Sequence, residues 1–468
     1  MKKFSLLLTM AALMVSSSVF AGSIDYLSNQ SAKYCMNTAA TARTDGADIV
    51  AYNPAGTALM GQGFFIDVSN QTLFKPYKQD VDVTIGGTPT LSESYKQDTP
   101  TWILPNVYLA YNFGQMGMGK LAVFGELGIV AGGGSLEWDG SAGVMAAGFQ
   151  IAQTVASIAG GSGRPTATDT TVKGSSVYYK AGLGASYAFL DDMLSVSAGV
   201  RYVYGDRSGA LDGKLNMYSA ATLVGPYTVD IDSEWEYTAK GYTPVFGLAV
   251  KPMKELTLAA RFEMETDLEF KYEQKKNNVN VTSSNPTLQG ALNSGGLPTA
   301  VAALLNKDGA KANQNLPQIL SLGAEYLVMP ELTVGLTGTI YWINKADMEG
   351  YEDYFDTGYE VAVGATYQVM NELKVGASVM YTSQSAKDEL LTDKSQLITV
   401  SGNPVLDSWF FGVGASYTVI PNLDLTLALS WVHYVPEDAD VTLATGVVES
   451  VSYKKDIYNI ALGASYKM

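Results

Sequence analysis

Three basic residues and one acidic residue are spaced so that they could meet on one polar face of neighbouring strands. Arg201 and Arg261 each lie on the polar side of a segment that alternates between polar and apolar residues. Glu263 follows Arg261 on the same side, and Lys180 belongs to an adjacent segment. A cation in a low-dielectric pocket binds a carboxylate, so these residues are candidate contacts for an acidic headgroup. The alternative is a set of structural ion pairs, since a neutral ligand would need no cation.

Catalytic and metal chemistry have little support in the sequence. His433 is the only histidine, so a multi-histidine metal site is excluded and a histidine-based triad has one candidate. No nucleophile or acid pair accompanies it at a strand end. The single cysteine, Cys35, cannot form an internal disulfide and is expected to be buried. We predict no enzyme activity, no metal and no cofactor, and we interpret three acidic pairs as solvated loop charge: Asp80/Asp82, Asp230/Asp232 and Asp438/Asp440.

Two long segments, 131–174 and 273–315, are unusually apolar for loops that should face water. Their large apolar side chains include Phe149, Ile151, Leu304 and Leu305. We expect these four side chains to lie close together. They form either a surface that binds a hydrophobic ligand or loops that pack on each other, and the two roles are compatible.

A run of three glycines, Gly132, Gly133 and Gly134, follows the third alternating segment. Glycine weakens a strand ladder and favours a bulge. The run therefore indicates either an opening in a wall of strands or an ordinary flexible start to a loop.

The elements that carry these residues are strands. Apolar residues alternate with polar ones, and a Leu/Val-Gly-Ala-x-Tyr pattern recurs beside short turns. The tyrosines of this pattern lie on the apolar face, as an interfacial girdle should, and they are Tyr187, Tyr326, Tyr367, Tyr417 and Tyr466. We predict an all-β fold, a transmembrane antiparallel β-barrel of about fourteen strands, because open sheet edges are not tolerated in lipid. The expected strands are 63–74, 102–113, 119–130, 175–189, 193–206, 240–251, 254–272, 316–327, 331–344, 356–368, 371–384, 405–418, 422–434 and 455–467.

The start and the composition of the chain agree with an exported membrane barrel. Lys2 and Lys3 precede an apolar stretch and small residues up to Ala21, which predicts a signal peptide at 1–21. The formal net charge of −16 argues against nucleic acid as a partner. Charged residues make up only 16% of a chain that has 47 Gly and 29 Tyr.

Residues 22–62 do not alternate, and they precede the predicted barrel at 63–468. Their Asn53-Pro54-Ala55-Gly56 turn, the lead-in at 45–48 and the fourteen-strand count resemble the FadL/TodX outer-membrane transporters of long-chain fatty acids and aromatic hydrocarbons. The resemblance implies that 22–62 is a hatch that plugs the lumen, and that the glycine run marks a lateral opening. One departure is the final Met468 in place of an aromatic residue, so Tyr458 and Tyr466 are expected to carry the assembly signal.

The resemblance implies passive uptake of hydrophobic small molecules across the outer membrane of a Gram-negative cell, by binding in the barrel and lateral release past the hatch. The expected partners are that substrate, outer-membrane lipid and lipopolysaccharide, and the barrel is expected to act as a monomer. A general diffusion porin is the alternative, although the prefix of about forty residues before the first strand argues against it. An outer-membrane enzyme and a surface adhesin have less support. The sequence leaves open whether the substrate is a fatty acid, an aromatic hydrocarbon or a terpenoid.

Overall fold

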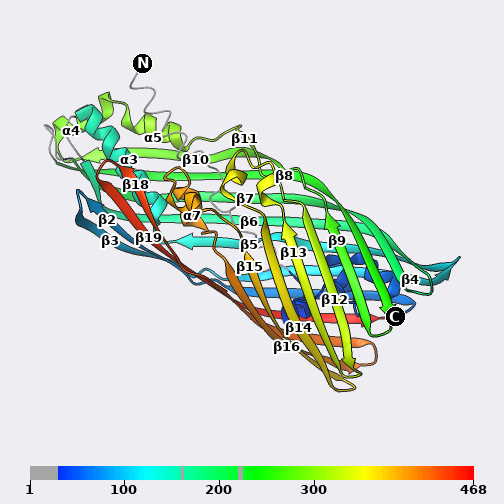
Figure 1. Cartoon of the computed structure of the whole chain (residues 1–468). Helices are drawn as coiled ribbons and strands as arrows, with labels where there is room; N and C mark the ends of the chain where they lie inside the picture. The colour runs from blue at the N-terminus through cyan, green and yellow to red at the C-terminus, as the bar shows by residue number, and fades with distance from the viewer. Residues whose placement is uncertain (1–29, 160–162, 220–224) are drawn as a thin grey trace.

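Fourteen strands form a closed antiparallel ring in the computed structural model, which describes residues 30–159, 163–219 and 225–468 (Figure 1). β1 pairs with both β4 and β19, and this pairing closes the ring and leaves no free edge. The predicted barrel and its strand number are confirmed, while the predicted signal peptide lies outside the described residues. The ring strands are β1 (Gly63–Phe74), β4 (Thr101–Met116), β5 (Gly119–Trp138), β6 (Gly163–Phe189), β7 (Leu194–Ser219), β8 (Gly225–Met253), β9 (Leu256–Glu263), β12 (Ile319–Met329), β13 (Leu332–Tyr341), β14 (Gly358–Met370), β15 (Leu373–Ser383), β16 (Ser408–Ile420), β17 (Leu423–Tyr434) and β19 (Val447–Lys467).

The barrel exterior is apolar and the side chains that face inward are small or polar. On β17, Leu425, Leu427 and Leu429 are 46–49% exposed, whereas Thr426 and Ser430 between and beyond them are buried. An apolar outer surface of this kind suits lipid contact. The period-two pattern therefore identifies the lipid-facing and lumen-facing sides of the strands correctly.

Several strands continue well beyond the length that a bilayer requires. β6, β7 and β8 have 27, 26 and 29 residues, whereas about ten residues of a tilted strand cross the membrane. The predicted spans 175–189 and 193–206 therefore end too early at their outer ends. In β8 the apolar side reverses, because Val229 and Ile231 face inward and are buried, while Phe246 and Leu248 face outward and are exposed. Outside the membrane the apolar side chains of β8 pack inward. A rule that expects apolar side chains to face outward therefore does not identify the outer part of this strand.

The outer part of the molecule also contains strands that the sequence analysis assigned to loops. β2 and β3 extend the sheet from β19, and β18 pairs on the other side of β19. The predicted strand 254–272 was wrong, because it is interrupted between β9 and β10. These additional strands are β2 (Tyr77–Ile85), β3 (Thr88–Gln97), β10 (Glu269–Ser283), β11 (Lys311–Asn313) and β18 (Glu437–Ala444).

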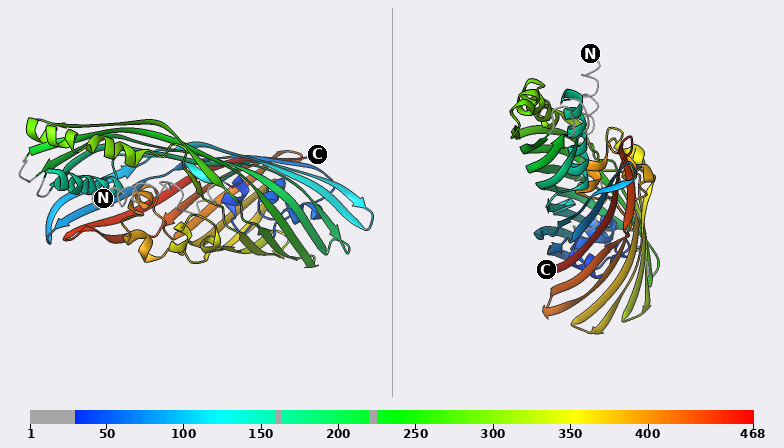
Figure 2. Two further views of the ribbon diagram at one scale, coloured as in Figure 1. Left: turned by 90° about the horizontal axis from the view of Figure 1, so that it is seen from above. Right: turned by 90° about the vertical axis from the view of Figure 1, so that its left-hand side faces the viewer.

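Helices cover the end of the barrel that lies away from the C-terminus (Figures 1 and 2). Their apolar side chains join those of the outer strands in one large buried cluster. None of the helices in the described part of the chain combines the length and apolar character needed to span a bilayer. They are α3 (Ala142–Ala159), α4 (Pro286–Ser294), α5 (Leu297–Leu305), α6 (Asp388–Thr392) and α7 (Leu397–Gly402), with short 3-10 turns η4 (Ile343–Lys345) and η5 (Tyr351–Tyr354).

The N-terminal segment, residues 30–62, lies within the ring near the end that holds the C-terminus (Figure 2, blue). It forms α2 (Ala32–Met36), η2 (Ala47–Ala51) and η3 (Pro54–Leu59). α2 contacts β15, β16, β17 and β19, whereas η3 contacts β4 to β8. The segment therefore contacts opposite parts of the inner wall.

Candidate functional site

A cavity of about 90 Å³ lies between the N-terminal segment and the barrel wall. This volume is smaller than the roughly 150 Å³ that accommodates one benzene molecule in an engineered protein core. In this state the cavity can hold a headgroup or a few waters, and a larger ligand requires movement of its walls. Its lining includes Tyr34, Thr38, Thr41 and Tyr52 from the N-terminal segment, and Lys180, Arg201, Arg261, Glu263, Tyr341 and Glu360 from the strands.

The structure brings the three predicted cations together in this cavity. Arg201 contacts Glu126 at 2.8 Å through Nε and reaches Glu263 through Nη1. Lys180 Nζ lies 2.8 Å from the second oxygen of Glu126, and Arg261 pairs with Glu263. Three cations thus share two carboxylates, which leaves one positive charge in the group.

The arginine–glutamate contacts are ion pairs, as the structural alternative predicts, but the group is not fully matched. The buried Nε of Arg261 has no hydrogen-bond partner among the described residues. An incoming carboxylate at this cluster would therefore find three cations shared by two carboxylates and an unused N–H group on Arg261. Glu126 was not among the predicted site residues, although its place between inward-facing Phe124 and Gly128 on β5 follows from strand parity.

A third acidic residue, Glu360, faces the cavity, and among the described residues it has no basic partner. The Tyr341 hydroxyl donates to it at 2.6 Å and the Thr382 hydroxyl at 3.2 Å. The cavity is therefore asymmetric, because the cations gather near β6, β7 and β9 while Glu360 lies on β14. The sequence analysis also missed Glu360, whose alternation with Val361 places it on the lumen side.

The predicted turn at Asn53, Pro54, Ala55 and Gly56 holds the N-terminal segment against the wall. Asn53 caps η3 by accepting from Ala55 N, and its amide donates to Leu248 O on β8 at 2.9 Å. Ser195 on β7 donates to Ala55 O at 2.7 Å. Gly56 is needed because a Cβ there would lie 2.9 Å from the Arg43 carbonyl oxygen. Two of these hydrogen bonds therefore join the N-terminal segment directly to strands of the barrel wall.

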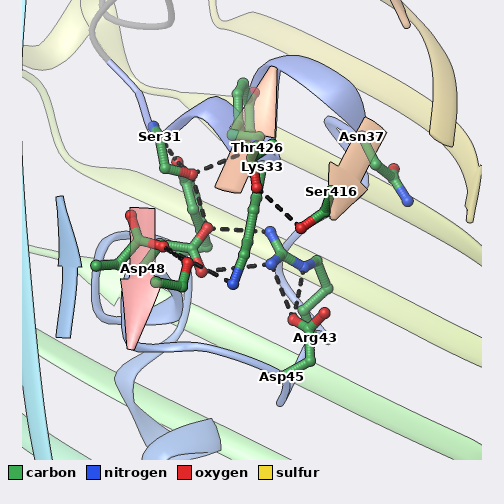
Figure 3. A network of polar contacts seen from close by, with 12 residues as sticks. Ser31, Lys33, Asn37, Arg43, Asp45, Asp48, Ser416 and Thr426 are labelled. Carbon is green, nitrogen blue, oxygen red and sulfur yellow. Dashed lines mark hydrogen bonds and ion pairs between the residues drawn. The ribbon is translucent and has the colours of Figure 1, made fainter. Parts of the chain in front are cut away.

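Buried charges organise the same segment internally, as Figure 3 shows for Arg43 between Asp45 and Asp48. Ser31 donates to Asp48 at 2.6 Å, and Lys33 lies 3.8 Å from Asp67 on β1. Arg43 pairs only with residues of its own segment, whereas Asp45 also pairs with Lys374 on β15 at 3.5 Å. The ion pairs therefore both organise the segment and join it to the barrel wall.

Cys35 is buried, as expected. Burial raises the pKa of its thiol to about 12, so the thiol stays protonated and unreactive. Side-chain amides of Gln71 and Asn459 donate to its sulfur. Its role is packing between α2 and the wall.

Wall glycines provide the space in which the N-terminal segment lies. A Cβ at Gly323 would meet Thr41 Cβ at 2.7 Å, and one at Gly335 would meet Ala39 Cβ at 2.9 Å. The same holds for Gly364, Gly376, Gly412 and Gly463 opposite Asn37, Met36, Cys35 and Ala32. Three of these glycines, Gly323, Gly364 and Gly463, belong to the recurring Leu/Val-Gly-Ala-x-Tyr pattern, whose packing role could not be recognised from the pattern alone.

The glycine run at 132–134 forms a bulge in β5. Gly132 and Gly134 have positive φ, and the β5–β6 register shifts at this point. The ladder between β4 and β5 ends at the pair Asn106 and Gly128, before the run begins. Beyond it, Lys75 Nζ donates to Gly133 O at 2.8 Å and to Ser135 O at 2.7 Å. Side-chain contacts therefore replace the backbone ladder where the lateral opening was predicted.

Solved structures provide the comparison for this geometry, since no family model and no curated protein matches the sequence. A FadL homologue of Pseudomonas aeruginosa matches with a TM-score of 0.64 at 16% identity, over 93% of this chain and 98% of that one. This chain has the FadL-type barrel fold. The Pseudomonas putida toluene transporter TodX matches with a TM-score of 0.57 at 15% identity, and the Ralstonia pickettii toluene transporter TbuX with 0.54 at 12%. Each covers 94% of this chain and 99% of its own.

Within this FadL-type fold the predicted apolar residues are buried at the outer end. Phe149 and Ile151 on α3 are 3% and 1% exposed, and they share one core with Leu305 on α5. The side chain of Leu304 lies outside the described residues. Packing is therefore one role of these side chains, and a ligand would reach them only if the helices separate.

The remaining candidate residues are His433 and the acidic pairs, and they contact other side chains of the protein. His433 Nδ1 lies 3.0 Å from Asp456, which also accepts from Trp431 at 2.8 Å, so His433 belongs to an outer aromatic cluster. Asp80 contacts Lys78 and Lys454 on strands rather than lying in a loop. The acidic pairs were therefore wrongly assigned to loops. In the described part of the chain no group of three or more His, Cys, Asp or Glu is arranged to hold a metal ion.

Proposed function

We propose that this protein is a passive channel for hydrophobic small molecules, such as long-chain fatty acids or aromatic hydrocarbons, in the outer membrane of a Gram-negative cell. The main support is a closed β-barrel whose own N-terminal segment contacts opposite parts of the inner wall, with a small cavity lined by Lys180, Arg201 and Arg261 between the two. The similar structures, a FadL homologue and toluene transporters, agree with this proposal. A general diffusion porin needs an open aqueous lumen, which a filled barrel does not offer.

In this proposal the outer helices receive the substrate. A hydrophobic molecule that leaves water for apolar walls gains roughly 25 cal/mol per Å² of buried apolar surface. α3 and α5 supply such walls through Phe149, Ile151 and Leu305 once they separate. The helices thus help a hydrophobic molecule pass the polar lipopolysaccharide layer. This transfer requires no energy source and no covalent step.

The cationic cavity is the proposed inner binding site. Arg201 and Arg261 hold an ionised headgroup if the substrate is an acid, while Tyr34 and Tyr52 contact its tail from the N-terminal segment. Because the cavity is smaller than such a substrate, binding and movement of the segment are coupled. We therefore assign residues 22–62 as the hatch.

Release is proposed to be sideways, between β4 and β5. The backbone ladder already ends there at Asn106 and Gly128, and Lys75 bridges the bulge through two carbonyl oxygens. A hatch shift together with loosening of the Gly132–Gly134 bulge opens the wall toward lipid. The closed ring needs no second copy for this route, so a monomer suffices.

The proposal is tested by uptake in cells that lack their own hydrophobic channels. Expression of this protein should speed uptake of radiolabelled toluene or dodecanoate without speeding entry of a hydrophilic sugar of similar mass. Faster sugar entry with no preference for the hydrophobic compounds would support the porin alternative and contradict the hatch.

A further inference from the structure

A second cavity lies on the outward side of the long outer strands, which run toward the end of the barrel away from the C-terminus (Figure 1). Its volume is about 410 Å³, and β5, β6, β7, β8 and β10 line it. Most of the lining side chains belong to the set that points away from the lumen. The cavity shares no lining residue with the one beside the N-terminal segment, so the two sites are separate.

Small side chains form the floor of this outer cavity. Ser135 on β5 pairs with Ser175 on β6, and Ser175 pairs with Ser208 on β7, so three serines form one row across the strands. Ala210 lies next to this row on β7. The hydroxyl groups of the three serines make no hydrogen bond with other described residues, so each can donate to a ligand and accept from it. We call this cavity the serine groove.

Charged side chains line the serine groove at both ends. Lys173 Nζ lies 3.2 Å from Glu137 Oε1, and Lys275 Nζ lies 3.0 Å from Glu236 Oε2. Glu234 also lines the groove, which therefore holds two cations and three carboxylates. A ligand rich in phosphate would meet a surplus of negative charge there. A ligand with several hydroxyl groups suits the groove, because hydroxyls donate to carboxylates and accept from ammonium groups, and exposed ion pairs are weak enough to share these atoms.

The height of the groove follows from aromatic residues on the barrel exterior. Tyr187 and Tyr179 on β6 are eight residues apart, about 26 Å along the strand and about 20 Å in height at a tilt of roughly 40°. Exposed Leu183 lies between them, so the two tyrosines mark the edges of the lipid-facing band. Ser175 lies four residues beyond Tyr179, roughly 10 Å above this edge. Because the headgroup region of a bilayer is only about 5–8 Å deep on each side, the groove lies above the headgroups.

We propose that the serine groove binds the core saccharide of a lipopolysaccharide molecule in the outer leaflet. Sugar rings present hydroxyl groups that match the serines and the ion pairs of the groove. The source is a membrane glycolipid, because exposed Leu183 on β6 and Val200 on β7 lie below the groove on the same strands, where they contact acyl chains. A glycolipid can contact the apolar band and the groove at the same time, which a free sugar cannot. This binding holds the barrel in its glycolipid surroundings and does not depend on what passes through the lumen.

The test is equilibrium binding of fluorescently labelled glycolipid to the full-length protein in lauryldimethylamine oxide, a detergent without a sugar headgroup. Two glycolipids are compared, lipid A alone and lipid A that carries its core saccharide. Wild type should bind the core-bearing glycolipid about tenfold more tightly. Ala210→Trp fills the groove and should bring the two affinities within about twofold of each other without weakening lipid A binding. Lys214→Trp is the matched control, because Lys214 is an exposed residue on the same face of β7 outside the groove, and it should keep the preference of wild type.

A second variant removes hydroxyl groups without adding bulk, in case the tryptophan impairs assembly. Ser175→Ala combined with Ser208→Ala should lower the preference for the core-bearing glycolipid about three- to tenfold. Core oligosaccharide released from lipid A should compete with the core-bearing glycolipid for wild type but not for Ala210→Trp. Equal binding of both glycolipids by wild type, or a preference that persists in both variants, would overturn the inference. Loss of the wild-type preference when magnesium is chelated would also overturn it, because cation-bridged phosphates rather than hydroxyl groups would then be recognised.

Discussion

A valine at Gly323 should dislodge the hatch without harming the barrel. Gly323 lies on β12 opposite the N-terminal segment, where an added Cβ would be 2.7 Å from Thr41 Cβ and 3.0 Å from Ala42 N. Ordinary carbon contacts begin near 3.5 Å, so the segment must retreat by roughly 1 Å, and the two valine methyls add to this displacement. Because backbone atoms are involved, a rotamer change of one side chain cannot relieve the clash.

The expected cost follows from overpacking. Inserting methyl groups into a packed interior destabilises it by about 1–3 kcal/mol. If this cost falls on the seated hatch rather than on the ring, the population with a displaced hatch rises about 5- to 150-fold. Valine is favourable in a strand, so β12 itself should pair normally.

Single-channel conductance in a planar bilayer measures the displaced population. Gly323→Val should give openings that are more frequent by that factor, and deletion of residues 22–62 should give a permanently larger conductance. Gly338→Val is the matched control, because it faces outward on the paired strand β13 and its Cβ would meet only Glu360 O, at 4.0 Å. Wild-type conductance in a correctly folded Gly323→Val barrel, or equal openings in Gly338→Val, would refute the seating argument.

Three further predictions concern the cavity, the bulge and the outer helices. Replacing Arg201 and Arg261 together by Met should weaken binding of an ionised fatty acid about tenfold more than that of its methyl ester, as measured by competition, and equal loss would favour a neutral hydrocarbon as the cargo. Lys75→Met removes two hydrogen bonds to the bulge and should speed amide exchange at 131–135 by about tenfold. The control is Lys78→Met, which removes a partly exposed lysine that pairs with Asp80 instead of the bulge, and equal exchange rates in the two variants would exclude Lys75 from the release route. Phe149→Ser should slow uptake of a hydrophobic compound while heat-modifiable barrel migration on gels persists; normal uptake would leave only the packing role.

The sequence predicts the barrel well because contact with lipid imposes one simple residue pattern on every ring strand. Each ring strand must place apolar side chains outward and small or polar ones inward, so Leu425 and Thr426 already identify their faces. Parity likewise placed Arg201 and Arg261 inside. The N-terminal Asn53 turn was recognisable because a cap followed by proline starts a helix locally.

Other features depend on contacts that a local pattern cannot contain. The outer strands β2, β3 and β18 have the opposite pattern, because their apolar side chains face inward against the helices. They therefore do not match the pattern expected of strands that face lipid. The repeat glycines were read as part of a hairpin, but their packing role against residues 32–41 depends on long-range contact.

The most direct test of passive hydrophobic transport uses vesicles whose outer leaflet is lipopolysaccharide and whose interior contains no energy source. The purified protein should speed equilibration of toluene and dodecanoate into the vesicle bilayer, while a small hydrophilic sugar remains excluded. Locking the hatch with a cross-link should abolish the acceleration. Equilibration at the protein-free rate, or acceleration that persists with the hatch locked, would contradict passage through the barrel past a movable hatch.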